Sequence, residues 1–64
     1  MSANNYLLIT DTDPPCGDYE LTEHDADTGE RLGKIIALNG DLKELIKTAT
    51  ALPQPIEYGL HFNI

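Results

Sequence analysis

Six carboxylates lie within thirteen residues of this chain, and they are its most conspicuous chemical groups. The stretch DYELTEHDADTGE, residues 18–30, contains no lysine or arginine, and Arg31 is the first basic residue of the chain. Carboxylates at this density can bind a metal ion, transfer protons or attract a positively charged partner. The candidate site residues, including two upstream acids, are Asp18, Glu20, Glu23, Asp25, Asp27, Glu30, Asp11 and Asp13.

A calcium site is the first possibility, because DADTGE has some likeness to the loop of an EF-hand. That loop needs an Asp or Asn at its fifth position and a glutamate at its twelfth. Counted from Asp25, these positions hold Gly29 and Ile36, so the pattern fails at both. A turn rich in Asp, Thr and Gly explains the same residues. The single cysteine and the two histidines lack the spacing of zinc ligands, so we expect no metal and no cofactor.

Catalysis is the second possibility, and the chain offers little for it. A general acid or base needs a partly desolvated cleft, whereas a charged hairpin is exposed to solvent. The lone cysteine, Cys16, has acidic neighbours that oppose formation of a nucleophilic thiolate. We expect residues 1–64 to form a single domain, whose small core can hardly spare a substrate-sized cavity. The sequence therefore favours a protein that is not an enzyme.

Charge is distributed unevenly along the chain. The formal net charge is −7, and residues 1–30 hold eight of the eleven acids and none of the four bases. Such a field repels nucleic acid and anionic membranes, so we expect neither to bind directly. No apolar run is long enough to span a bilayer, and the first ten residues lack the basic start of a signal peptide. These features favour a cytoplasmic protein.

The acidic cluster has two interpretations. It can be a solvated face, because a net charge of about 2–8 in magnitude is common for a small domain. That interpretation leaves the crowding unexplained, since carboxylates about 7 Å apart on a strand repel by roughly 0.6 kcal/mol per pair in water. The alternative is mimicry, in which carboxylates at this spacing replace the phosphates of a nucleic-acid strand in a basic groove. We favour mimicry and keep the solvated face as the rival.

The elements that must position these carboxylates follow the order βββαβ. Apolar patterning predicts strands at residues 5–10, 18–24, 30–38 and 56–64. A helix begins after Asp41, a good N-cap, with Glu44 placed to complete a capping box, and it ends before Pro53. Its apolar stripe consists of Leu42, Leu45, Ile46, Ala49 and Leu52. We expect an α+β fold: an antiparallel sheet of about four strands with one helix packed on one face.

The central hairpin and the last strand carry more specific expectations. Gly29 should adopt a left-handed conformation in the turn, and Leu21 should lie opposite either Ile35 or Lys34. In the last strand, alternation places Leu60, Phe62 and Ile64 at one edge of the core. Because one helix covers only one sheet face, some of the other strands' apolar residues should remain uncovered. These candidates are Leu7, Ile9, Leu32, Ile35 and Ile36.

In size, acidity and architecture, the whole chain resembles the small phage-encoded anti-CRISPR proteins. The resemblance is carried by the capped helix GDLKELIKTATAL and the acidic hairpin DYELTEHDADTGE. Several of those proteins present carboxylates to the DNA-binding groove of a surveillance complex. The resemblance implies an inhibitor in the host bacterial cytoplasm that mimics DNA and blocks a PAM-reading subunit, foremost of a type I complex such as I-C. Because the family shares no motif, the site residues remain the eight carboxylates named above.

The expected partner is therefore a basic DNA-binding protein surface. The alternative is a protein-interaction module, such as an antitoxin-like or phage regulatory subunit, that binds through the uncovered sheet face. A structural phage protein is a third class. The oligomeric state stays open, with a monomer favoured.

Overall fold

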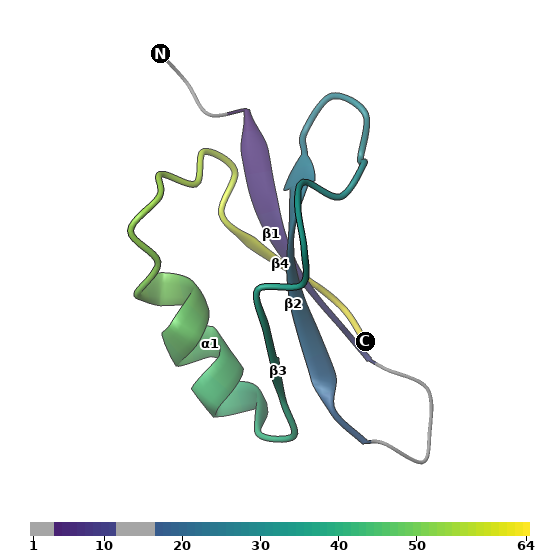
Figure 1. Ribbon diagram of the computed structural model, residues 1–64, viewed down its shortest axis with the longest axis vertical. Coiled ribbons are helices and arrows are strands. Elements are labelled where there is room, and N and C mark those ends of the chain that lie inside the picture. The colour runs from purple at the N-terminus through teal and green to yellow at the C-terminus, as the bar shows by residue number, and fades with distance from the viewer. Residues whose placement is uncertain (1–3, 12–16) are drawn as a thin grey trace.

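A computed structural model describes residues 4–11 and 17–64. It contains β1 (Asn5–Asp11), β2 (Tyr19–Asp25), β3 (Ala37–Asn39), α1 (Leu42–Thr50) and β4 (Leu60–Asn63). The strands form one sheet in the order β3-β2-β1-β4, with α1 lying alongside it (Figure 1). The α+β class and the order βββαβ are confirmed.

The sheet is mixed, and the expectation of a wholly antiparallel sheet is wrong at one pair. β2 is antiparallel to both β1 and β3, whereas β4 is parallel to β1. The cause is the helix: β3 already runs in the direction of β1, and α1 carries the chain back across the sheet. The next strand therefore starts from the same end and runs parallel to β1 and β3.

The helix forms where the sequence predicts it. The Asp41 side chain accepts a hydrogen bond from the Lys43 N–H at 3.0 Å, as an N-cap does. The predicted capping box is wrong, because the Asp41 N–H donates to the Asn39 side chain at 2.7 Å and Glu44 pairs with Lys47 instead. The apolar stripe is confirmed: Leu45 and Ala49 are buried, while Leu42, Ile46 and Leu52 are half-buried.

The core lies between α1 and one face of the sheet. Its buried residues are Leu7, Ile9, Leu21, Leu45 and Ala49. Of the apolar residues expected to stay uncovered, Leu32 and Ile35 are exposed, whereas Leu7 and Ile9 are buried. Burying an aliphatic side chain contributes roughly 1.5–3 kcal/mol, so these residues contribute strongly to the driving force for folding.

Phe62 does not belong to the core, contrary to expectation. Its side chain is 48% exposed and Ile64 is 59% exposed, while Leu60 is half-buried. A helix is about 10 Å across and covers about two strands at a spacing of ~4.8 Å. Because α1 packs against β2 and β3, the far edge at β4 lies beyond its reach. The strand is also shorter than predicted, since the backbone turns through a positive φ of 77° at Gly59.

The central hairpin departs from the predicted register. Gly29 has the expected positive φ, and Arg31 pairs with His24, but the ladder then breaks and resumes with Ala37 opposite Leu21. Neither predicted partner of Leu21 is correct. The break is centred on Gly33, whose φ of 77° turns the chain out of the ladder. The residues after it loop out before the strand rejoins β2, so residues 30–38 are not one continuous strand.

Candidate functional site

The two faces of the hairpin divide the candidate carboxylates between them. Glu23 lies opposite Leu7 and Asp25 opposite Asn5, so both belong to the face that α1 covers. Glu20 lies opposite Thr10 on the open face. The carboxylates on β2 therefore do not form a single stripe, although they all lie along the β1–β2 ladder.

Glu23 has a structural task that the sequence analysis did not predict. It is half-buried, and its carboxylate accepts hydrogen bonds from the Asn5 side chain at 2.6 Å and the Gln54 side chain at 3.5 Å. These bonds connect β2 to β1 and to the segment that follows α1. The carboxylate of Glu23 consequently faces partly into the protein rather than into solvent.

Asn5 is the centre of this polar clamp. It is only 3% exposed, and besides Glu23 its amide group donates to the Pro55 carbonyl at 3.1 Å. Its side-chain oxygen accepts from the Glu57 N–H at 3.0 Å, and its backbone carbonyl accepts from the Tyr58 N–H. A buried amide whose hydrogen bonds are all made fixes the position of its partners. Asn5 thus holds residues 55–58 against β1. The sequence signal for this role was an asparagine inside the apolar run NYLLIT.

Asp25 organises the turn of the hairpin. Its Oδ1 accepts from the Asp27 N–H at 3.0 Å and from the Asn4 side chain at 3.3 Å. Its Oδ2 accepts from the Thr28 hydroxyl at 3.3 Å. This is the arrangement of an Asx turn, in which the side chain replaces a backbone acceptor. Asp25 therefore shapes the loop that carries Asp27 and Glu30.

The remaining carboxylates differ in their exposure to solvent. Asp11, Asp27 and Glu30 are exposed, and Asp18 and Glu20 are half-buried. Asp11 and Asp18 lie at one end of the β1–β2 ladder, whereas Asp27 and Glu30 lie beyond the other end. Asp13 and Cys16 lie outside the described residues.

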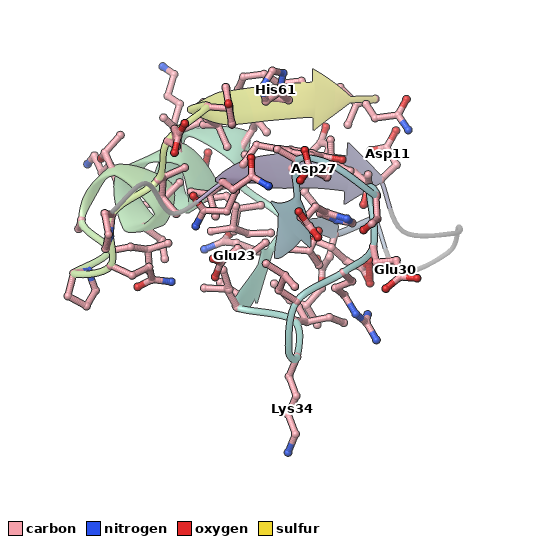
Figure 2. The ribbon with its side chains drawn as sticks, turned by 90° about the horizontal axis from the view of Figure 1, so that it is seen from above. Asp11, Glu23, Asp27, Glu30, Lys34 and His61 are labelled. Carbon is pink, nitrogen blue, oxygen red and sulfur yellow. The ribbon has the colours of Figure 1, made fainter. Side chains whose placement is uncertain are left out.

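Three of the four basic side chains lie apart from these acids. Lys43 and Lys47 are on α1, and Lys34 extends away from the sheet on the side opposite β4 (Figure 2). Arg31 is the exception, because it follows Glu30 in the hairpin and lines the same hollow of the open face as Glu20. Over residues 4–11 and 17–64, no ion pair reaches Glu20, Asp27 or Glu30, and the salt bridge that does form joins Glu44 and Lys47 at 3.7 Å. The separation of charge in the sequence therefore persists in the fold for the lysines but not for Arg31.

The open face of the sheet carries a polar and aromatic cluster that was not predicted. The Tyr6 ring stacks on His24, with ring centroids 5.4 Å apart, and meets His61 edge-on at 5.2 Å. His24 hydrogen-bonds through Nε2 to the Thr22 hydroxyl at 2.8 Å and through Nδ1 to the Gly29 carbonyl at 3.0 Å. A hydroxyl beside an oriented imidazole is the geometry of an activated nucleophile. Because Thr22 is only 4% exposed, its hydroxyl is closed to a substrate and serves to hold β2 in place.

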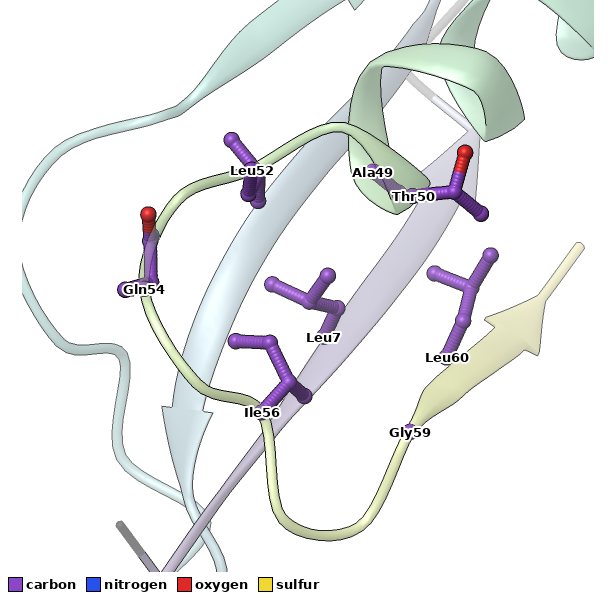
Figure 3. A pocket seen from close by; sticks show the side chains of 8 residues that line it. All are labelled: Leu7, Ala49, Thr50, Leu52, Gln54, Ile56, Gly59 and Leu60. Atoms are coloured by element: carbon purple, nitrogen blue, oxygen red, sulfur yellow. The ribbon is translucent and has the colours of Figure 1, made fainter.

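A pocket of about 340 Å³ opens between the end of α1 and the start of β4. Its walls include Leu7, Leu52, Ile56 and Leu60, whose side chains converge in Figure 3. Neither charged groups nor metal ligands line it.

Nearby carboxylates perturb the titration of Tyr58, which lies at the clamped end of the sheet. A hydrogen bond to the Glu57 carboxylate, followed by the negative charges of Glu57 and Asp27, raises the pKa of the Tyr58 phenol above its usual value. In the described part of the chain, no group of three or more His, Cys, Asp or Glu side chains is placed to hold a metal ion. Nor does any helix there have the length and apolarity to cross a membrane.

No protein-family model matches the chain, and neither a curated protein nor a solved structure matches it significantly.

Proposed function

We propose that this protein is an inhibitor that places carboxylates where the phosphates of DNA would bind on a basic partner protein. The observation that carries the proposal is the group of carboxylates along and beyond the β1–β2 ladder, none of which forms an ion pair with another described residue. The group consists of the exposed Asp11, Asp27 and Glu30 and of the half-buried Glu20 on the open face.

The cost of this arrangement supports the proposal. Of the four bases, only Arg31 lies on the acidic hairpin, where it pairs with His24. The fold puts the other three elsewhere, with Lys43 and Lys47 on α1 and Lys34 in a loop at the β3 edge. A concentrated negative field accelerates the encounter with a positive groove, and it loses its effect as salt rises.

The length of the β1–β2 hairpin also favours a groove as the surface that it binds on the partner protein. β1 and β2 pair over seven residues, which at ~3.3 Å per residue extends roughly 20 Å between the two acidic ends. DNA phosphates on one strand repeat at ~3.4 Å along the helix axis, so this length corresponds to about half a turn of a duplex. Carboxylates at both ends could meet a basic groove at two separate places.

As the target, we propose the PAM-reading subunit of a type I CRISPR surveillance complex, in the bacterial cytoplasm. Such a subunit holds duplex DNA in a basic surface, which is the chemistry that the open carboxylates require. The family resemblance in size, acidity and architecture supports this choice of target. Glu23 and Asp25 contribute indirectly, because their hydrogen bonds fix the hairpin on which the open carboxylates stand.

Competition binding tests the proposal. A purified type I surveillance complex is titrated with the protein, with and without duplex target DNA, at low and high salt. We expect mutually exclusive binding and an affinity that falls steeply as salt rises. Simultaneous, salt-insensitive binding of protein and DNA would contradict mimicry.

A matched pair of charge reversals locates the surface. Asp27→Lys and Glu44→Lys change the net charge equally, but only Asp27 lies at the acidic end of the hairpin, while Glu44 is on α1. We expect Asp27→Lys to slow association by about tenfold, because steering depends on local charge, and Glu44→Lys to have a smaller effect. Equal effects of the two substitutions would indicate a response to net charge alone.

An interaction module that binds through the open sheet face is the second candidate. Leu38 is 53% exposed on that face, opposite Glu20. If this candidate is correct, Leu38→Lys abolishes partner binding while Asp27→Lys leaves it intact.

A further inference from the structure

β4 is an edge strand that lacks the residues that usually block pairing. It is the last strand of the sheet, and Figure 2 shows it outermost, beyond β1. Natural edge strands are blocked by lysine, proline or a bulge, or are kept very short, and of these protections β4 has only its length of four residues. Residues 58–64, YGLHFNI, contain no proline and no Asp, Glu, Lys or Arg. The edge is therefore chemically open to another strand.

Apolar side chains flank this open edge. Phe62 lies beside Ile9 on the helix side of the sheet, yet it is 48% exposed, and Ile64 beyond it is 59% exposed. A strand added at β4 would extend the apolar side of the sheet and cover both side chains.

The backbone of β4 fixes the register that an added strand must take. The Leu7 N–H donates to the Gly59 carbonyl, so odd-numbered residues of this segment bond towards β1. Because successive residues of a strand alternate in direction, the N–H and C=O groups of Leu60 and Phe62 point to the free edge.

We propose that the edge of β4 pairs with β4 of a second copy of this chain, antiparallel, about a twofold axis at Phe62. In this register Phe62 faces Phe62 of the second copy, and Leu60 faces Ile64. These residues carry the outward-pointing backbone groups, so each facing pair can exchange two hydrogen bonds. His61 and Asn63 face each other on the opposite side of the extended sheet. Apolar residues thus meet apolar ones, and polar residues meet polar ones.

The negative charge of the chain does not prevent a second copy from pairing at the β4 edge. In the paired sheet the two β1 strands, which carry Asp11, are three strand spacings or about 14 Å apart, and the two β2 strands are five spacings or about 24 Å apart. The Debye length at physiological ionic strength is about 8 Å, so repulsion between the two acidic hairpins is largely screened. The dimer is expected to strengthen as salt rises, in contrast to the proposed binding of a basic partner. It does not depend on that proposed function.

Amide hydrogen exchange at several protein concentrations tests the register on the unaltered chain. In the monomer, the Leu60 and Phe62 amides exchange rapidly, while the His61 and Asn63 amides are protected by β1. As concentration rises, we expect protection to appear at Leu60, Phe62 and Ile64, together with a doubling of mass in sedimentation. A protein that stays monomeric at all concentrations overturns the proposal, as does a dimer without protection at Leu60 and Phe62.

A matched pair of variants completes the test. Phe62→Lys places two like charges on the twofold axis, and we expect it to raise the dimer Kd at least about tenfold. Leu32→Lys introduces the same charge at a side chain of similar exposure, 42%, away from β4, and should leave the Kd unchanged. Equal effects of both substitutions would refute pairing through β4.

Discussion

Strand β1 pairs with β2 on one side and with β4 on the other. The β1–β2 hairpin and the free edge of β4 nevertheless differ in charge and in burial. The hairpin carries the open carboxylates, and its covered face is closed by Leu7, Ile9 and Leu21. The β4 edge has no charged residue from Tyr58 to Ile64, and it leaves Phe62 half exposed. One region suits attraction over a distance, which salt weakens, and the other suits contact between apolar surfaces.

The comparison also separates carboxylates that shape the fold from those that only carry charge. Glu23 and Asp25 accept hydrogen bonds that hold β1, the turn and the segment after α1. Asp27 and Glu30 stand on the turn that those bonds create. A substitution in the first pair tests stability, whereas one in the second pair tests the negative field.

The largest expected effect distinguishes the covered face from the β4 edge. Leu21 is fully buried, so Leu21→Ala should lower the free energy of unfolding by about 2–5 kcal/mol. That loss is comparable to the whole stability of so small a domain, roughly 3–5 kcal/mol. Phe62→Ala should cost only about 1 kcal/mol in the monomer, because half of its side chain is already exposed. Urea denaturation at low protein concentration measures both, and equal losses would place Phe62 in the core after all.

The second effect concerns the polar clamp. Asn5→Ala leaves the Glu23 carboxylate, the Pro55 carbonyl and the Glu57 N–H without their partner, which should cost at least about 2 kcal/mol. Asn63→Ala, at an exposed position of β4, is the control and should change stability by less than about 0.5 kcal/mol. Equal melting temperatures for the two variants would show that the clamp contributes nothing.

The third effect separates the two kinds of carboxylate. Glu23→Lys removes the acceptor of the buried Asn5 amide and should destabilise the fold by about 1–2 kcal/mol. Glu23→Gln retains an acceptor oxygen and should cost less. Asp27→Lys should stay within about 0.5 kcal/mol of the unaltered protein, since its side chain is exposed. Thermal unfolding of the three variants gives the comparison, and a large loss for Asp27→Lys would reverse the assignment of roles.

The predictable parts of the fold were those with strong local signals. The Asp41 cap and the stripe on α1 each follow from short-range patterning, and both are confirmed. The parallel pairing of β4 depends on the strand docking beside β1, and the exposure of Phe62 depends on how far one helix reaches across the sheet, and local pattern specifies neither.

The candidate site shows the same limit. Sequence spacing identified the acidic hairpin, but that α1 covers the face of Glu23 and Asp25 depends on how the helix packs against the sheet. The break at Gly33 placed the register of β3 against β2 beyond prediction, because a looped-out segment shifts every later pair. The tasks of Glu23 and Asp25 were hidden for another reason: their partners Asn5, Gln54 and Asn4 are distant in sequence.

The smallest expected effect lies where the two compared regions meet, at Tyr58 beside the hairpin turn. The hydrogen bond to Glu57 raises the pKa of the Tyr58 phenol, and the charge of Asp27 raises it further. We expect an alkaline NMR titration to show Tyr58 titrating above the ordinary value for tyrosine. Glu57→Gln should lower that pKa more than Asp27→Asn does, because Glu57 supplies the largest contribution. A pKa that neither substitution changes would place both carboxylates too far from Tyr58 to influence it.

The direction of this shift determines its effect on stability. A raised pKa means that the folded state favours the neutral phenol, so the contribution of Tyr58 is fully present below the pKa of tyrosine in the unfolded chain. It is lost as pH rises through the higher pKa of the folded state, where a tyrosinate would face the Glu57 and Asp27 carboxylates. Denaturation across the alkaline range should therefore show a shallow decline in stability that Tyr58→Phe removes. Because Tyr58 is 53% exposed, that decline should be smaller than the effect of any substitution at Leu21, Asn5 or Glu23.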